Sequence, residues 1–197
     1  AGYNSMARTD IFAQNDLGEL WYTCGDRTYA SISWPYINAK PMSIDIEKIR
    51  ELLNPDRTRD LNRIHAWALP ESSIASGIPV DNLRQVYDFI KERFPQKTIY
   101  LPVTHNDFSN SRFADYVPPC DTILIKLPVF DPKIYSELEP GIRDPILVMN
   151  YWIENVKKIA PGKPIWVSLQ VEQNGDVAAS PEQFRTMAYL AISQGAT

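Results

Sequence analysis

Residues 64–73 read IHAWALPESS, a short apolar run that ends in a glutamate. The run is continuously apolar rather than alternating, which is typical of a strand buried on both faces in a parallel sheet. Pro70 closes the run, and Glu71 follows where the strand should become a loop. Glu71 is therefore either a solvated loop residue or the functional end of a buried strand.

Three more apolar runs follow this one, and longer segments with helical spacing separate most of them. The runs are KTIYLPVT (97–104), DTILIKLPVF (121–130) and KPIWVSLQV (163–171). Before the first of them, residues 80–94 place apolar side chains on one helical stripe: Leu83, Val86, Tyr87, Ile90 and Phe94. This alternation predicts βα units around a parallel sheet, and so an α/β fold.

Two later helices carry their own start signals. The Asp-Pro pair at 144–145 predicts an N-cap and a first helical position. The SPEQ segment at 180–183 fits a capping box for a last helix that should end at Gly195. The pattern calls for a strand after that helix, and the sequence as given has none, so we expect an incomplete domain.

The amino-terminal third has a different pattern. LGELWYTCG (17–25) and TYASISW (28–34) predict two strands with a short turn between them, either a hairpin or two loosely linked strands, and residues 43–53 predict a helix. We take residues 1–197 as a single, partial domain. The placement of residues 1–59 within it does not follow from the pattern.

Composition excludes several classes of partner. A net charge of −4 without a long run of one sign argues against nucleic acid and anionic membranes as partners, and no apolar stretch is long enough to span a bilayer. A neutral polymer or a small molecule is the expected partner. Cys24 and Cys120 are too few for a zinc cluster, and we favour two buried thiols over a disulfide. The compartment is left unresolved, with an extracellular or periplasmic location slightly favoured.

Several segments resemble the glycoside-hydrolase-like TIM barrels over roughly residues 60–197. They are WALPES (67–72), DTILIKLPVFDP (121–132), KPIWVSLQVEQ (163–173) and the final FRTMAYLAISQGA (184–196). The resemblance implies a (β/α)8 TIM barrel that is incomplete in this chain, because the last strand and part of the amino-terminal half are missing. A full barrel takes about 250 residues.

The resemblance also implies a function. In that clan the acid/base lies at the end of the fourth strand, here like Trp67–Glu71, and the nucleophile at the end of the seventh, here like Ile165–Glu172. The chain departs from the pattern at Pro70, where the family often has aspartate or asparagine, and at Gln170, where it commonly has glutamate. Glu71 is thus the implied general acid, and Glu172 or Asp107 would complete the pair.

Glycosidic bond cleavage needs one protonated and one ionised carboxyl group, about 5 to 9.5 Å apart. An apolar wall, to which Trp67 would contribute, would suit Glu71 to the acid role. Other candidates for substrate contact are His105, Asn106, Lys126, Asp131, Gln170 and Trp34. A capping role for Asn106 and Asp107 stays open, and so does a structural ion pair for Lys126.

No cofactor is expected. The nucleotide-binding, zinc-protease and serine-hydrolase motifs are missing, and two histidines make a transition-metal site improbable. A Ca²⁺ or Mg²⁺ ion at Asp107 or Asp131 is left open. The sequence predicts a glycoside hydrolase; the alternative is a non-catalytic carbohydrate-binding or structural assembly protein on the same scaffold. An open barrel edge would recruit a second chain, which a size measurement in solution would detect.

Overall fold

A computed structural model describes residues 11–12, 20–24, 27–31, 37–39, 42–52, 64–126, 144–169 and 179–197. Within these ranges a seven-stranded sheet has the order β1-β2-β3-β6-β7-β8-β9, and β4 and β5 form a separate pair. The strands are β1 (Ile11–Phe12), β2 (Leu20–Cys24), β3 (Arg27–Ser31), β4 (Ile37–Ala39), β5 (Met42–Ile44), β6 (Ile64–Ala68), β7 (Thr98–Val103), β8 (Thr122–Lys126) and β9 (Ile165–Ser168).

The helices alternate with the later strands, as the sequence predicted. They are α1 (Ile46–Leu52), α2 (Val80–Arg93), α3 (His105–Phe108), the 3-10 helix η3 (Phe113–Tyr116), α5 (Pro145–Ile159) and α6 (Pro181–Ser193). Among the described residues, no helix combines the length and the apolarity that crossing a membrane requires.

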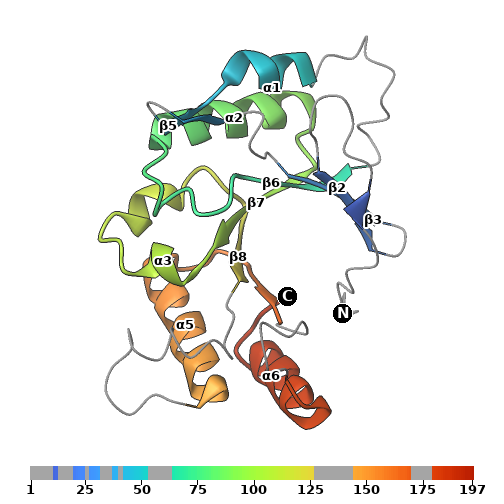
Figure 1. Ribbon diagram of the computed structural model, residues 1–197, viewed down its shortest axis with the longest axis vertical. Coiled ribbons are helices and arrows are strands. Elements are labelled where there is room, and N and C mark those ends of the chain that lie inside the picture. Colours follow the sequence, from blue (N-terminus) through green and yellow to red (C-terminus); the bar gives the residue numbers. More distant parts are fainter. Residues whose placement is uncertain are drawn as a thin grey trace.

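Strands β6, β7, β8 and β9 are parallel and adjacent in chain order, and β3 pairs parallel to β6. The predicted α/β fold with a parallel sheet is thereby confirmed. Each crossover from β6 onward moves in the same direction along the sheet, and right-handed crossovers then place their helices on one face. In Figure 1 the strands follow a curve, with α1, α2, α3 and α5 on its outer side.

The two faces of the parallel strands carry separate apolar clusters. Trp67, Leu101 and Ile123 belong to the large cluster that includes the buried side chains of α2 and α5. The alternate side chains form a smaller cluster on the opposite, concave face: Ala66, Ala68, Tyr100 and Leu124, with Trp166 packed against them. Burial on both faces explains why these strands read as continuous apolar runs instead of alternating ones.

A proline in the interior strand β7 needs a physical account, because proline donates no hydrogen bond to a ladder. Pro102 lies two residues after Tyr100, whose carbonyl accepts from Leu69 N at 2.9 Å, so both residues face β6. The last register pair between β6 and β7 is Ala68 with Tyr100. The missing N–H of Pro102 therefore falls beyond the β6 ladder, where it costs no pairing.

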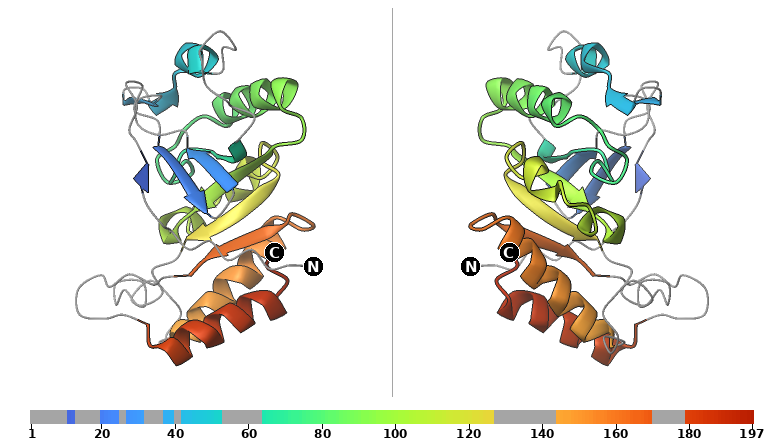
Figure 2. Two further views of the ribbon diagram at one scale, coloured as in Figure 1. Left: turned by 90° about the vertical axis from the view of Figure 1, so that its right-hand side faces the viewer. Right: turned by 90° about the vertical axis from the view of Figure 1, so that its left-hand side faces the viewer.

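The predicted helix starts are confirmed. Asp144 Oδ1 accepts from Ile146 N at 2.7 Å, and Pro145 opens α5. Ser180 and Gln183 form the capping box of α6. The two views of Figure 2 show α5 and α6 together at one end of the sheet and α1 and α2 at the other.

The amino-terminal third agrees with the sequence in part. β2 and β3 form the predicted antiparallel hairpin, and β3 joins it to the parallel strands through β6. The prediction of a helix from residue 43 was wrong at its start, because Met42–Ile44 pairs with Ile37–Ala39 as β5. Helix α1 begins only at Ile46.

Candidate functional site

Two charged side chains meet at the carboxyl edge of the parallel sheet. Glu71 follows β6, and Lys126 is the last residue of β8, 55 positions later in the chain. Lys126 Nζ donates to Glu71 Oε1 at 2.8 Å, and the two side chains are 40% and 51% exposed. The ion pair that the sequence left open for Lys126 is therefore present, and its partner is the leading site candidate, Glu71.

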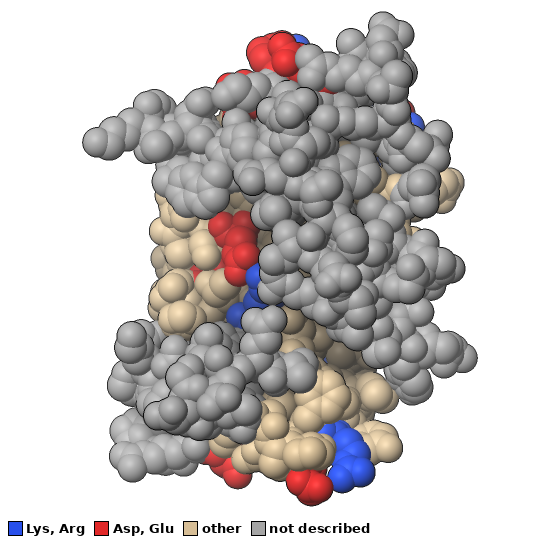
Figure 3. Space-filling view, turned by 45° about the vertical axis from the view of Figure 1, so that its right-hand side comes forward, with Lys and Arg blue, Asp and Glu red and all other residues tan. Residues whose placement is uncertain are grey.

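Alternation along β8 places Lys126 on the concave face. Leu124 belongs to the concave cluster, and Lys126, two residues further on, shares its face of the strand. The register partner of Lys126 on β9 is Ser168, which is exposed. In Figure 3 acidic and basic side chains adjoin near the middle of the face shown, and the other charged groups in that view lie toward its top and bottom.

The backbone directly after Glu71 is strained. Ser72 has φ 56°, and it is the one non-glycine residue with positive φ in the described part of the chain. A left-handed conformation costs a residue with a Cβ roughly 1 kcal/mol or more, and such strain collects at functional sites. Ser73, fully buried, donates from its hydroxyl to the carbonyl of Pro70 and closes the turn that presents Glu71.

Asp107, the alternative second carboxylate, lies in a different setting. It is fully buried, and its oxygens accept three hydrogen bonds: from Ala75 N at 2.9 Å, Thr104 N at 2.8 Å and Thr104 Oγ1 at 3.0 Å. The bonds to Thr104 belong to a capping box at the start of α3. The capping role that the sequence left open for Asp107 is therefore confirmed, and the side chain presents no surface to a substrate.

Other predicted contact residues fall outside the Glu71–Lys126 pair. Trp67 is 1% exposed and packs in the cluster between sheet and helices, on the face of β6 opposite Ala66 and Ala68. It cannot supply the apolar wall for Glu71. His105 and Asn106 open α3 at the carboxyl end of β7; the Nδ1 atom of His105 is buried and has no hydrogen-bond partner within the described ranges.

Four predicted site residues lie outside the described residues. They are Trp34, Asp131, Gln170 and Glu172. The second carboxylate of the proposed pair, Glu172, is among them, and so is one of the two candidate ligands for Ca²⁺ or Mg²⁺. In the ranges that are described, His, Cys, Asp and Glu side chains nowhere gather as three or more potential metal ligands.

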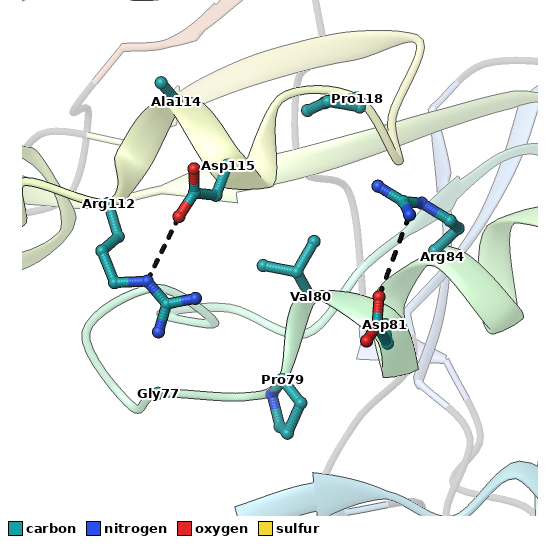
Figure 4. Close-up of a pocket in the computed structure, with 9 residues that line it drawn as sticks. All are labelled: Gly77, Pro79, Val80, Asp81, Arg84, Arg112, Ala114, Asp115 and Pro118. Carbon is teal, nitrogen blue, oxygen red and sulfur yellow. Dashed lines mark hydrogen bonds and ion pairs between the residues drawn. The ribbon is translucent and has the colours of Figure 1, made fainter.

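A hollow of about 650 Å³ lies on the outside of the sheet, where the segment before α2 meets the segment around η3. Figure 4 shows Arg112 with Asp115 on one side, Arg84 with Asp81 on the other, and Val80 between them. Each arginine already has an aspartate partner, at 3.2 and 3.9 Å, and all four side chains are more than half exposed. The hollow therefore offers a neutral, solvated surface.

A network that the sequence did not reveal lies at the opposite edge of the sheet. Asp121 accepts from Tyr87 Oη at 2.9 Å and from Ile99 N at 2.8 Å, and it pairs with Lys91 at 2.7 Å. Burial, with help from Asp121, raises the pKa of Tyr87 to about 12. The amino edge of a parallel sheet carries stability rather than chemistry, so we assign this network to the fold.

Cys120 precedes that network and is a buried free thiol, as predicted. Burial raises its pKa to about 12 although the Lys163 ammonium acts against the rise. Only the thiolate is nucleophilic, so the group is inert at neutral pH. Two tryptophans pack against other rings: the ring centroids of Trp152 and Phe108 lie 4.1 Å apart, and those of Trp166 and Tyr100 lie 5.3 Å apart.

Comparison with protein-family models gives no match for this chain, and comparison with curated protein sequences gives none either. The likeness to glycoside-hydrolase barrels therefore rests on the segments at 67–72, 121–132, 163–173 and 184–196 alone.

Proposed function

We propose that the protein acts on a carbohydrate at the carboxyl edge of its parallel sheet, with Glu71 as general acid in cleavage of a glycosidic bond. The observation that carries the proposal is the meeting of Glu71 and Lys126 at this edge, from strands that are not neighbours. Ligands of parallel α/β sheets bind outside the carboxyl ends of the strands. A charged pair assembled there from distant segments fits such a site.

The proposed architecture is a (β/α) barrel of which this chain forms a part. In such barrels the strands follow one another in chain order, and every crossover moves in the same direction. In doubly wound sheets the direction of the crossovers reverses. The concave cluster corresponds to the packed interior of a barrel. Thr197 N donates to Ile165 O at 2.9 Å, on the edge of β9 away from β8, which is where a barrel places its next strand.

The chemistry gives each member of the pair a role. An incoming sugar separates the ion pair, so that Lys126 donates to a substrate hydroxyl and Glu71 faces the glycosidic oxygen. Once Lys126 has turned to the substrate, the Glu71 carboxylate takes up a proton from solvent. Glu71 donates that proton to the glycosidic oxygen as the C–O bond breaks, and water supplies the hydroxyl of the new reducing end. The second carboxylate takes the water proton; Glu172 is the candidate, since Asp107 is buried and fully bonded.

A second candidate is sugar binding without hydrolysis. One specific observation favours it. Within the described part of the chain, the Glu71 carboxylate forms an ion pair with the Lys126 ammonium group, at 2.8 Å, which compensates its charge. A carboxylate held by an ammonium group is suited to accept hydrogen bonds from hydroxyls. Binding then needs only the pair and the polar edge around Ser168.

Hydrolysis of a panel of aryl glycosides and polysaccharides tests the proposal. We expect Glu71→Gln to lower kcat on the best substrate by about 10²- to 10⁴-fold, the usual contribution of a general acid. Glu92→Gln, an exposed change on α2, is the matched control and should keep the wild-type rate. An unchanged rate in Glu71→Gln overturns the acid role, and wild-type binding without turnover selects the second candidate.

A further inference from the structure

We propose that Asp107 is a positioning residue, which holds the loop between β6 and α2 so that Glu71 meets Lys126. We call this segment, residues 69–79, the Glu71 loop. The inference rests on the proposed function in one respect, which is the reason why Glu71 has to meet Lys126. The hydrogen bonds of Asp107 and their test involve no substrate.

One buried carboxylate joins two segments that follow neighbouring strands. Oδ1 of Asp107 accepts from the backbone N–H of Ala75, in the Glu71 loop, at 2.9 Å. Its Oδ2 accepts from the N–H and the hydroxyl of Thr104, directly after β7. Hydrogen bonds to an ionised, desolvated carboxylate are about twice as strong as neutral ones. Asp107 therefore ties the Glu71 loop to the end of β7, and we call its bonds to Ala75 and Thr104 the Asp107 clamp.

Two more side chains from the same region reach the Glu71 loop. Asn110 Nδ2 donates to Ile74 O at 3.3 Å, and Tyr116 Oη donates to Ile78 O at 2.8 Å in a buried setting. With Asp107, these side chains hold the backbone of the loop at three points, which are residues 74, 75 and 78. None of the three side chains contacts Glu71 itself through these bonds, so their effect on the carboxylate is indirect.

Bonds within the loop carry that restraint to Glu71. Ser76 N donates to Ser72 O at 2.9 Å, and Ile78 N donates to Ser73 O at 3.0 Å. The clamped half of the loop is thereby bonded to the half that carries the carboxylate. A left-handed residue such as Ser72 persists only when its surroundings over-determine it. The Asp107 clamp supplies that restraint.

The test compares Asp107→Asn with the wild-type protein in two measurements. Asparagine has the same shape. The orientation that keeps an oxygen on the two Thr104 donors puts its NH₂ group against the Ala75 N–H, so the bond from Ala75 is lost. Hydrogen exchange of the Ala75 amide reports the clamp directly. The rate at which an acylating reagent labels the Lys126 amine, measured by mass spectrometry of peptides, reports the ion pair, because Glu71 shields that amine.

We expect exchange at Ala75 to be about tenfold faster or more in Asp107→Asn, as loss of a charged hydrogen bond implies. Labelling of Lys126 should rise about two- to fivefold, the size expected for a partly exposed ion pair, and should match Glu71→Gln. Asp115→Asn, an exposed aspartate on η3, is the matched control and should change neither rate at these two positions.

Faster exchange at Ala75 with wild-type labelling of Lys126 would show that Asp107 only stabilises the loop, and it would overturn the inference. If Asp107→Asn does not fold, Tyr116→Phe removes a single loop bond at nearly constant volume. It should raise both rates by smaller factors, and unchanged labelling in it overturns the inference too. Neither measurement depends on turnover, so a failure of the hydrolase proposal leaves this test intact.

Discussion

Ser72 is the residue at which the account can be tested with the smallest change. Its φ of 56° suits glycine better than any residue with a Cβ. We expect Ser72→Gly to keep or raise the free energy of unfolding, because relief of strain offsets the added freedom of the unfolded chain. Ser76→Gly, exposed and without positive φ, should lower it by about 0.5–1 kcal/mol.

Urea unfolding of both variants measures the difference. A Ser72→Gly loss as large as that of Ser76→Gly would contradict the assignment of strain to this position. A gain in stability with lower activity would further link the strain to function.

Sequence reasoning identified both members of the central pair but not their partnership. Glu71 drew attention because it ends an apolar run, and Lys126 because a lysine inside such a run needs a partner. Their contact depends on the register of β6, β7 and β8, which no local pattern encodes. The burial of Asp107 follows from the fold as well, although the sequence had left a capping role open for it.

At the scale of elements, Asp121 joins α2, β7 and β8 at the amino edge of the sheet. It bonds Tyr87 and Lys91 on α2 and the backbone of Ile99 on β7, and it directly precedes β8. Removing one partner of such a partly buried charged pair lowers the free energy of unfolding, because the other charge is left uncompensated.

This junction predicts a loss of stability in alkali. The pKa of the Tyr87 hydroxyl is raised by burial from 10.0 to about 12, and that of the Cys120 thiol from 9.0 to about 12. Between about pH 9 and 12 the unfolded chain releases protons that the folded chain keeps, so the free energy of unfolding must fall as pH rises. Below pH 9 both contributions are fully present.

Thermal unfolding midpoints measured from pH 8 to 12 check this. As pH rises, the unfolding midpoint of Tyr87→Phe should fall less steeply than that of the wild-type protein. The midpoint of Tyr189→Phe, at a tyrosine that is 72% exposed, should follow the wild-type curve. A Tyr87→Phe curve parallel to the wild-type curve would contradict the linkage.

Long elements were predictable and short ones were not. The helix α2 and the strands β6 to β9 were recognised because each has enough residues for a periodic or continuously apolar pattern. The β4–β5 pair was missed because three-residue strands carry no period. Its second strand overlaps the start of the helix that was predicted from residue 43.

At the scale of the whole molecule, strand order is the feature that positions the site. Strands β6 to β9 advance in one direction around a curve, and their carboxyl ends come to one edge. Glu71 after β6, His105 after β7 and Lys126 at the end of β8 are therefore gathered there by topology. The sequence predicted the parallel sheet from the alternation of strands and helices, whereas a site at the strand ends was only what the resemblance implied.

The most direct test is to locate the surface at which a sugar binds. The oligosaccharide that binds best in the substrate screen is titrated into Glu71→Gln, and amide shifts are mapped by NMR. We expect the largest shifts at residues 71 and 72, at His105 and at Lys126 and Ser168, at the carboxyl edge. Shifts confined to other surfaces, such as the hollow between α2 and η3 in Figure 4, would contradict it, and so would the absence of any bound sugar.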